Sequence, residues 1–147
     1  MFNYYFENER EAQVDTVKLF EEIKAGKYQA FTSVYTIEEL MKATETKRKK
    51  MIAIIEDYGI KALERSKEAE GLAHVYLDDG IIPKSSYTDA LHIAIATVND
   101  IDMIISLNFR HIVRKKTIEG TEYVNSRNGY RRIQIFSPME VVEREDT

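Results

Sequence analysis

Asp89 is the residue whose surroundings most clearly indicate chemistry. It lies at the start of residues 87–98, whose apolar composition predicts a buried helix. Residues 103–106 then predict a buried strand, which runs into a polar turn at Asn108. Open α/β sheets bind their ligands at the carboxyl ends of their strands. The sequence therefore predicts a functional site around Asp89 and this turn.

The chemistry available to such a site is that of carboxylates. Glu39 is a second acid near the start of a predicted helix, and it follows the predicted strand 28–34. Carboxylate oxygens are hard ligands that favour Mg²⁺ or Mn²⁺. A divalent ion held in this way can activate water for the hydrolysis of a phosphodiester. Glu39 and Asp89 are therefore candidate metal ligands.

Most other reaction classes lack their residues in this sequence. The chain has no cysteine, so it offers neither a disulfide framework nor a thiol nucleophile. It has no glycine-rich nucleotide-binding loop and no Gly-x-Ser-x-Gly motif. Its three histidines lack the spacing of a zinc site. Metal chemistry based on acids remains.

Both acids also have a purely structural interpretation. Thr36 and Glu39 have the spacing of a capping box, and Ser86 and Asp89 repeat this spacing with an aspartate. Such caps stabilise a helix by about 0.5–2 kcal/mol and need no ligand. The local pattern leaves capping and catalysis as equal alternatives for Asp89, and it favours capping for Glu39.

The charge pattern points to local rather than general binding of nucleic acid. A net charge of −4 does not favour a protein that coats nucleic acid through bulk charge. One basic cluster nevertheless follows the candidate site directly, and it consists of Arg110, Arg114, Lys115 and Lys116. These side chains could bind phosphates of RNA. The alternative is a set of solvated charges on helix ends and loops.

Predicted helices and strands alternate along the whole chain. The predicted helices are 9–25, 36–55 with a bend in its basic stretch, 66–80, 87–98 and a short one at 138–143, and the predicted strands are 28–34, 60–63, 103–106 and 133–136. The polar stretch 117–131 predicts a surface loop. This alternation predicts one α/β domain over residues 1–147, with a mostly parallel sheet between helices.

Nothing in the sequence indicates a membrane protein or an exported one. The longest apolar run, 90–96, is too short to cross a bilayer, and the amino terminus lacks a signal-peptide pattern. We therefore expect a cytoplasmic protein that does not associate with membranes.

Several segments together carry a resemblance to a known family. They are FNYYF at 2–6, SVYTIEEL at 33–40, TDALHIA at 88–94, SLNFRH at 106–111 and NGYRRI at 128–133, with Ser137 and Pro138 after them. In this order they resemble the PIN domain family, and within it the small stand-alone toxins of VapC-type toxin–antitoxin pairs. The resemblance covers nearly the whole chain, and its most specific motif is the one at 88–94.

The resemblance implies a fold, an activity and partners. The fold is a three-layer α/β/α PIN-like domain, and the activity is that of a metal-dependent ribonuclease. The catalytic and metal-binding positions fall on Glu39, Asp89 and Asn108, with Mg²⁺ or Mn²⁺ as the ion. At Asn108 the family often has aspartate, so this amide is expected to be a neutral ligand or to position water. The implied partners are RNA, a small antitoxin protein and a second copy in a homodimer.

One departure from the family concerns the amino terminus. Family members begin with a hydrophobic strand that ends in an aspartate, and this sequence begins just after that point. The first strand is therefore expected to be missing, either through a start codon assigned too far downstream or through a true truncation. Because one carboxylate is then absent, we expect little or no Mg²⁺-dependent activity from this chain. The alternative function is a catalytically impaired PIN-like remnant, or a module that binds RNA or a protein without cleavage.

Overall fold

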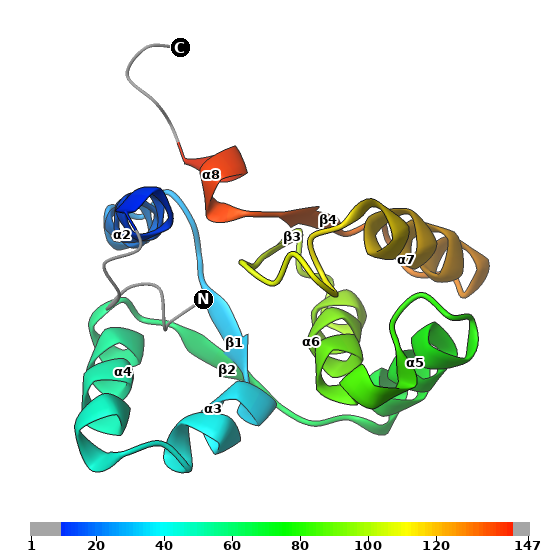
Figure 1. Ribbon diagram of the computed structural model, residues 1–147, viewed down its shortest axis with the longest axis horizontal. Helices are drawn as coiled ribbons and strands as arrows, with labels where there is room; N and C mark the ends of the chain where they lie inside the picture. Colours follow the sequence, from blue (N-terminus) through cyan, green and yellow to red (C-terminus); the bar gives the residue numbers. More distant parts are fainter. Residues whose placement is uncertain (1–9, 143–147) are drawn as a thin grey trace. The chain divides into compact units, whose positions relative to one another are not determined.

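The structure, a computed structural model, describes residues 10–142, the first five of them as backbone only. The fold is mixed α/β (Figure 1). The chain divides into two compact units whose relative positions are not determined. One unit comprises residues up to Ala62 together with those from Pro138 onward, and the other comprises Leu63–Ser137. None of the helices within 10–142 has the length and apolar run that a membrane crossing requires.

The first unit packs short helices against a two-stranded sheet. Its elements are α2 (Arg10–Lys24), β1 (Phe31–Ser33), α3 (Val34–Met41), α4 (Glu45–Asp57), β2 (Lys61–Leu63) and α8 (Pro138–Val141). Strands β1 and β2 pair with each other, and Phe20, Ile54 and Ile60 form a buried cluster. Helix α8 packs against α2, and the Tyr28 hydroxyl donates a hydrogen bond to the Val141 carbonyl at 3.3 Å.

Two expectations for this unit are wrong in detail. Helix α3 begins two residues earlier than expected, because Ser33 caps it by accepting a hydrogen bond from the Thr36 amide at 3.2 Å. The continuous helix expected over 36–55 is instead two helices, since Thr44 caps a new helix by accepting from the Lys47 amide. The family-like segment 2–6 lies outside the described residues.

The second unit contains the segments that form the candidate site. Its elements are α5 (Lys67–Asp78), the 3₁₀ turn η1 (Lys84–Ser86), α6 (Tyr87–Val98), β3 (Met103–Ile105), α7 (Lys115–Arg127) and β4 (Gln134–Phe136). Helix α6 has the bounds expected from the sequence, and it packs along α5 (Figure 1). The apolar face expected for α5 is confirmed, because all five of its residues are buried: Ala69, Leu72, Ala73, Tyr76 and Leu77.

Strands β3 and β4 form a parallel pair joined by a helix. Met103 pairs with Gln134 and Ile105 with Phe136, so α7 is the crossover that a parallel connection requires. The surface loop expected at 117–131 is therefore wrong. The described strands form two pairs rather than one continuous sheet. The three-layer arrangement around a single sheet stays a prediction.

The buried face of α7 is largely polar, which explains why this helix was missed. Thr117, Thr121 and Asn125 are at most 1% exposed. The Tyr76 hydroxyl donates to Asn125 Oδ1, and Asn125 Nδ2 donates to Thr97 Oγ1 at 3.3 Å. The buried Asn125 amide is thereby satisfied by Tyr76 and Thr97. A search for apolar periodicity has no signal to find in such a helix.

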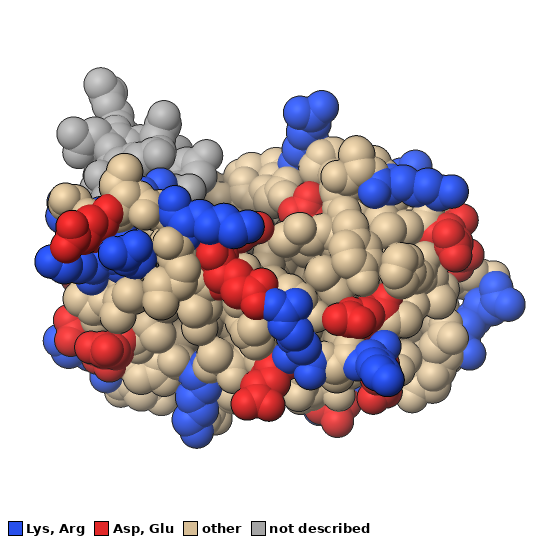
Figure 2. Space-filling model, turned by 90° about the horizontal axis from the view of Figure 1, so that it is seen from below, with Lys and Arg blue, Asp and Glu red and all other residues tan. Residues whose placement is uncertain are grey.

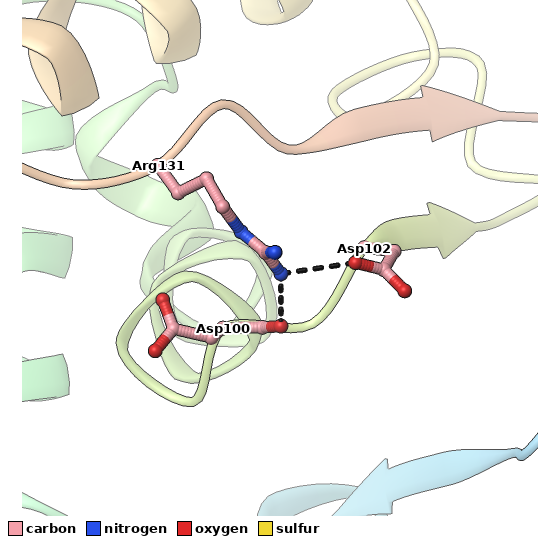
Figure 3. A network of polar contacts seen from close by, with 3 residues as sticks. All are labelled: Asp100, Asp102 and Arg131. Atoms are coloured by element: carbon pink, nitrogen blue, oxygen red, sulfur yellow. Dashed lines mark hydrogen bonds and ion pairs between the residues drawn. The ribbon is translucent and has the colours of Figure 1, made fainter.

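A polar clamp joins the two chain segments that lead into the parallel strands. The Arg131 guanidinium donates to the Asp100 carbonyl and to Asp102 Oδ1, the latter at 2.9 Å (Figure 3). The Gln134 amide also donates to the Asp102 carbonyl at 3.2 Å. Because Arg131 and Asp102 are exposed, their ion pair contributes only about 0–1 kcal/mol. Its role is to hold the entry of β4 beside that of β3.

Two helical glycines provide a matched test of packing in this unit. A Cβ at Gly120 of α7 would lie 2.7 Å from Ile81 Cγ1, whereas a Cβ at Gly71 of α5 would meet nothing within 4 Å. We expect Gly120→Ala to lower the free energy of unfolding by about 1 kcal/mol or more, because overpacking of 1–3 kcal/mol exceeds the gain in helix propensity. Gly71→Ala should raise it by about 0.5–1 kcal/mol. Urea unfolding of both variants measures this, and equal stabilisation of the two would contradict the packing described.

The buried Tyr76 predicts a loss of stability at high pH. Burial raises the pKa of Tyr76 from 10.0 to about 12, although its hydrogen bonds to Thr97 and Asn125 act in the opposite direction. Between these pH values the unfolded chain has lost a proton that the folded chain keeps, so the free energy of unfolding falls as pH rises. Below about pH 10 this contribution is fully present.

Urea unfolding measured across this pH range checks the prediction. Tyr76→Phe should reduce the slope of stability against pH relative to the parent chain. An unchanged slope in Tyr76→Phe would rule out Tyr76 as its source.

Candidate functional site

Asn108 organises the loop that follows β3. Its backbone amide donates to Ser106 Oγ at 3.0 Å, and its carbonyl accepts from the amides of Ile112 and Val113 at 3.1 and 2.8 Å. Leu107 and Ile112 are buried on either side of it. The loop is therefore held at both ends by apolar side chains and between them by hydrogen bonds to one residue.

Asp89 lies half-buried in the first turn of α6. The capping box that was one of two alternatives for Ser86 and Asp89 is not formed, because the Ser86 side chain makes no capping hydrogen bond. The Ser86 amide, which a capping carboxylate would bind, donates instead to the Pro83 carbonyl at 2.8 Å. The Asp89 carboxylate is thus left for another partner.

That partner is Asn108. Asn108 Nδ2 donates a hydrogen bond to Asp89 Oδ1 at 3.1 Å, and Asn108 Oδ1 accepts one from the His111 amide at 2.9 Å. This orientation of the amide is the only chemically consistent one, because an ionised carboxylate can only accept and a backbone amide can only donate. The start of α6 and the loop after β3 are therefore joined through one side chain.

The orientation of Asn108 determines which atoms a metal ion could use. Its amide oxygen already accepts the His111 amide, so Asn108 orients the Asp89 carboxylate rather than offering an oxygen of its own. Asp89 Oδ2 has no hydrogen-bond partner among residues 10–142 and is a hard ligand suited to Mg²⁺ or Mn²⁺. Carboxylates that bind metals usually receive such an orienting hydrogen bond. In the described part of the chain, no three acidic, histidine or cysteine side chains gather as a metal site.

Glu39 is exposed on α3, in the first unit. The capping box expected from Thr36 and Glu39 is wrong, because the helix is capped by Ser33 and Glu39 lies beyond its first turn. Asp89 and Asn108 are therefore brought together within one unit. Glu39 belongs to the other unit and is not placed relative to them.

The four side chains of the predicted phosphate-binding cluster differ in whether they already contact other residues of the chain. Arg114 donates from Nε to Thr117 Oγ1 at 2.9 Å and from Nη2 to the Ile81 carbonyl at 3.2 Å, so it anchors the start of α7. Lys115 lies 4.0 Å from Glu119. Arg110 and Lys116 are exposed, and neither forms an ion pair within the described residues. Arg110 and Lys116 are therefore available to a ligand, and the exposed Lys115 makes only a weak surface contact with Glu119.

The charges on one face of the molecule are mixed in sign. On the face drawn in Figure 2, basic and acidic side chains are interspersed, without a broad field of one sign. This distribution fits the small net charge of the sequence. An RNA contact would then depend on a few defined side chains.

Two surface features escaped the sequence analysis. Phe109, directly after Asn108, is 50% exposed, and no local pattern shows whether a lone aromatic residue in a turn faces solvent or core. A groove of about 590 Å³ also lies in the second unit. It is lined by Asp79, Gly80, Ile81, Lys116, Glu119, Gly120, Tyr123, Val124 and Arg127. Its lining carries two acidic and two basic side chains, so its charge favours neither anionic nor cationic ligands. The groove was missed because α7 was expected to be a loop.

The substitution Asn108→Asp tests the arrangement of the site. The new side chain keeps an acceptor for the His111 amide but sets a second carboxylate beside Asp89. Without metal we expect the free energy of unfolding at neutral pH to fall by about 2 kcal/mol, because a charge-assisted hydrogen bond is replaced by repulsion. Saturating Mn²⁺ should restore much of this loss, because it binds the pair of carboxylates. Urea unfolding in chelator and in Mn²⁺ measures both effects.

The matched control is Asn128→Asp, whose amide donates to the Val124 carbonyl at 2.8 Å instead of to a carboxylate. It should lose stability without recovery in Mn²⁺. If Asn108→Asp is as stable as the parent in chelator, the Asp89–Asn108 contact is not formed as described.

Comparisons with known proteins leave this site without an assignment. No protein-family model matches the sequence, and no curated protein or solved structure matches the chain. The function of the Asp89–Asn108 pair is therefore inferred from its own residues.

Proposed function

We propose that this chain is a divalent-metal-dependent ribonuclease of the PIN type and the toxin of a toxin–antitoxin pair. The observation that carries the proposal is the 3.1 Å hydrogen bond from Asn108 to Asp89. It fixes a half-buried carboxylate beside the carboxyl end of a parallel strand, where α/β folds bind their ligands. The hydrogen bonds of a capping box are absent at Asp89, and its carboxylate is held by Asn108 instead, which supports a ligand-binding role.

Each residue of the proposed site has a distinct role. Asp89 binds the ion through Oδ2, and Asn108 keeps this carboxylate in one orientation. Glu39 is proposed as a second carboxylate ligand, on the strength of its position in the PIN-like motif. When bound, Mg²⁺ or Mn²⁺ supplies an activated water and neutralises charge on the scissile phosphodiester. Arg110 and Lys116 bind phosphates of the RNA.

The wider assignment rests on the sequence resemblance. A three-layer PIN-like fold is supported by the parallel β3–α7–β4 unit with α6 before it. A cytoplasmic location, a small antitoxin and a second copy as partners follow from the resemblance alone. These remain parts of the proposal.

A second candidate is a PIN-like module that binds RNA or a protein without cleaving RNA. It is favoured by the orientation of Asn108, which gives Asp89 a neutral donor where a second carboxylate would strengthen cation binding. Glu39 is not placed relative to the pair, and within residues 10–142 no group of three acidic, histidine or cysteine side chains gathers around Asp89. The two candidates differ in whether RNA is cleaved when a divalent ion is present.

Cleavage of a labelled single-stranded RNA by the full chain in Mn²⁺ tests the first candidate. We expect Asp89→Asn to reduce the rate by at least about a hundredfold, because it removes the charge that binds the ion. Asn108→Ala should reduce it about 10–100-fold, as is usual for a residue that orients a ligand. Line broadening of backbone NMR signals by Mn²⁺ provides a second readout, and it should centre on residues near Asp89 and disappear in Asp89→Asn.

The control Asp79→Asn changes an exposed acid of the same unit and should leave both readouts unchanged. Cleavage by Asp89→Asn at the parent rate would exclude Asp89 as the metal ligand. RNA binding without cleavage in either Mn²⁺ or Mg²⁺ would support the second candidate in place of the first.

A further inference from the structure

We infer that Phe109 and Arg110 form a subsite for single-stranded RNA, in which the phenyl ring stacks on a base and the guanidinium binds a phosphate. The inference rests on the proposed ribonuclease function and specifies the form of RNA that the site takes. The sequence analysis placed Arg110 in a general basic cluster and assigned no role to Phe109.

The backbone that carries the two residues is fixed. Asn108 accepts hydrogen bonds from the amides of His111, Ile112 and Val113, and the Phe109 amide donates to the Leu107 carbonyl at 3.0 Å. The His111 carbonyl in turn accepts from Thr117 Oγ1 at 2.7 Å, which ties the loop to α7. Residues 109 and 110 thus sit in a turn whose geometry exists before any ligand binds. Preorganisation of this kind lowers the entropic cost of binding.

The exposure of Phe109 sets it apart from its apolar neighbours. Leu107 and Ile112 are 8% and 4% exposed, whereas Phe109 is 50% exposed. One exposed apolar side chain is ordinary on a protein surface. This one, however, directly follows the residue that orients the Asp89 carboxylate. An exposed planar face is therefore available in the loop whose Asn108 contacts Asp89.

Arg110 supplies the charge that a stacked nucleotide requires. It is exposed and forms no ion pair within residues 10–142, unlike Lys115, which lies near Glu119. The neighbouring Arg114 is occupied by Thr117 and by the Ile81 carbonyl. Of the two arginines in this loop, Arg110 is therefore the one able to bind a phosphate without breaking an existing contact.

The combination selects unpaired RNA over a duplex. An aromatic ring next to a cation is the arrangement that proteins use for single strands, where base faces are accessible. In a duplex the bases stack on each other and offer no face to a side chain. The subsite would thus bind an unpaired nucleotide at the loop that carries Asn108.

Binding in EDTA tests the subsite without any cleavage. Fluorescence anisotropy of a short fluorescein-labelled single-stranded RNA is measured with the full chain and compared with the same RNA as a duplex. We expect tighter binding of the single strand. Phe109→Ala and Phe109→Leu should both weaken it about tenfold or more, whereas Phe109→Tyr should retain it, because stacking needs a planar ring. The matched control is Tyr123→Ala, at an aromatic residue that is 60% exposed in the same unit.

The role of Arg110 is measured through the salt dependence. Arg110→Gln should reduce the slope of log affinity against log salt by about 0.7, the value for one phosphate contact on a single strand. Lys67→Gln, at an exposed cation at the start of α5, should leave the slope unchanged.

Three outcomes would overturn the inference. They are no measurable binding of single-stranded RNA, equal affinity for strand and duplex, and unchanged affinity in Phe109→Ala. A change of oligomeric state by light scattering in Phe109→Ala, with RNA affinity retained, would identify the ring as a protein contact instead. Phe109-dependent binding without cleavage in Mn²⁺ would refute the nuclease and keep the subsite. If cleavage depends on Asp89 and Phe109→Ala binds RNA with normal affinity, the subsite is refuted and the nuclease is kept.

Discussion

Asn108 joins three parts of the second unit, and the candidate site depends on this one residue. Its side chain holds Asp89 at the start of α6, and its carbonyl and amide groups set the loop that follows β3. The His111 amide completes the set by donating to its side-chain oxygen, and the same loop then leads into α7. Because every polar group of Asn108 is used, the residue cannot rotate without breaking contacts on two sides. Asp89 therefore receives a fixed orientation from a loop and not from its own helix.

Parts of this arrangement could be predicted from the sequence. The helix over 87–98 and the buried face of α5 were predictable because apolar residues recur at helical spacing there. The proximity of Asp89 to the turn at Asn108 followed from the general placement of ligands in α/β folds. Helix α7 was not predictable in this way, since Thr117, Thr121 and Asn125 give its buried face a polar composition.

The roles of the two acids could not be decided by spacing alone. Both capping boxes had suitable residues, yet Ser33 starts α3 before Thr36, and the Ser86 amide binds the Pro83 carbonyl. The first outcome depends on the Ser33 hydroxyl, which accepts from the Thr36 amide, and the second on a backbone hydrogen bond, and spacing alone selects neither. The orientation of the Asn108 amide is similar, because it follows from a carboxylate on one side and a backbone donor on the other. The assignment to the PIN family stays a prediction from motif order.

The parallel pairing of β3 and β4 has a consequence for the order in which the chain is made. Met103 pairs with Gln134, so among the strands of residues 10–142 the partner of β3 is made only after the whole of α7. Asp89 and Asn108 are separated by only 19 residues and are available to each other earlier. Closing the shorter loop costs less chain entropy. During synthesis the Asp89–Asn108 contact can therefore form before β4 is available, and the arrival of β4 then covers the edge of β3 with which it pairs.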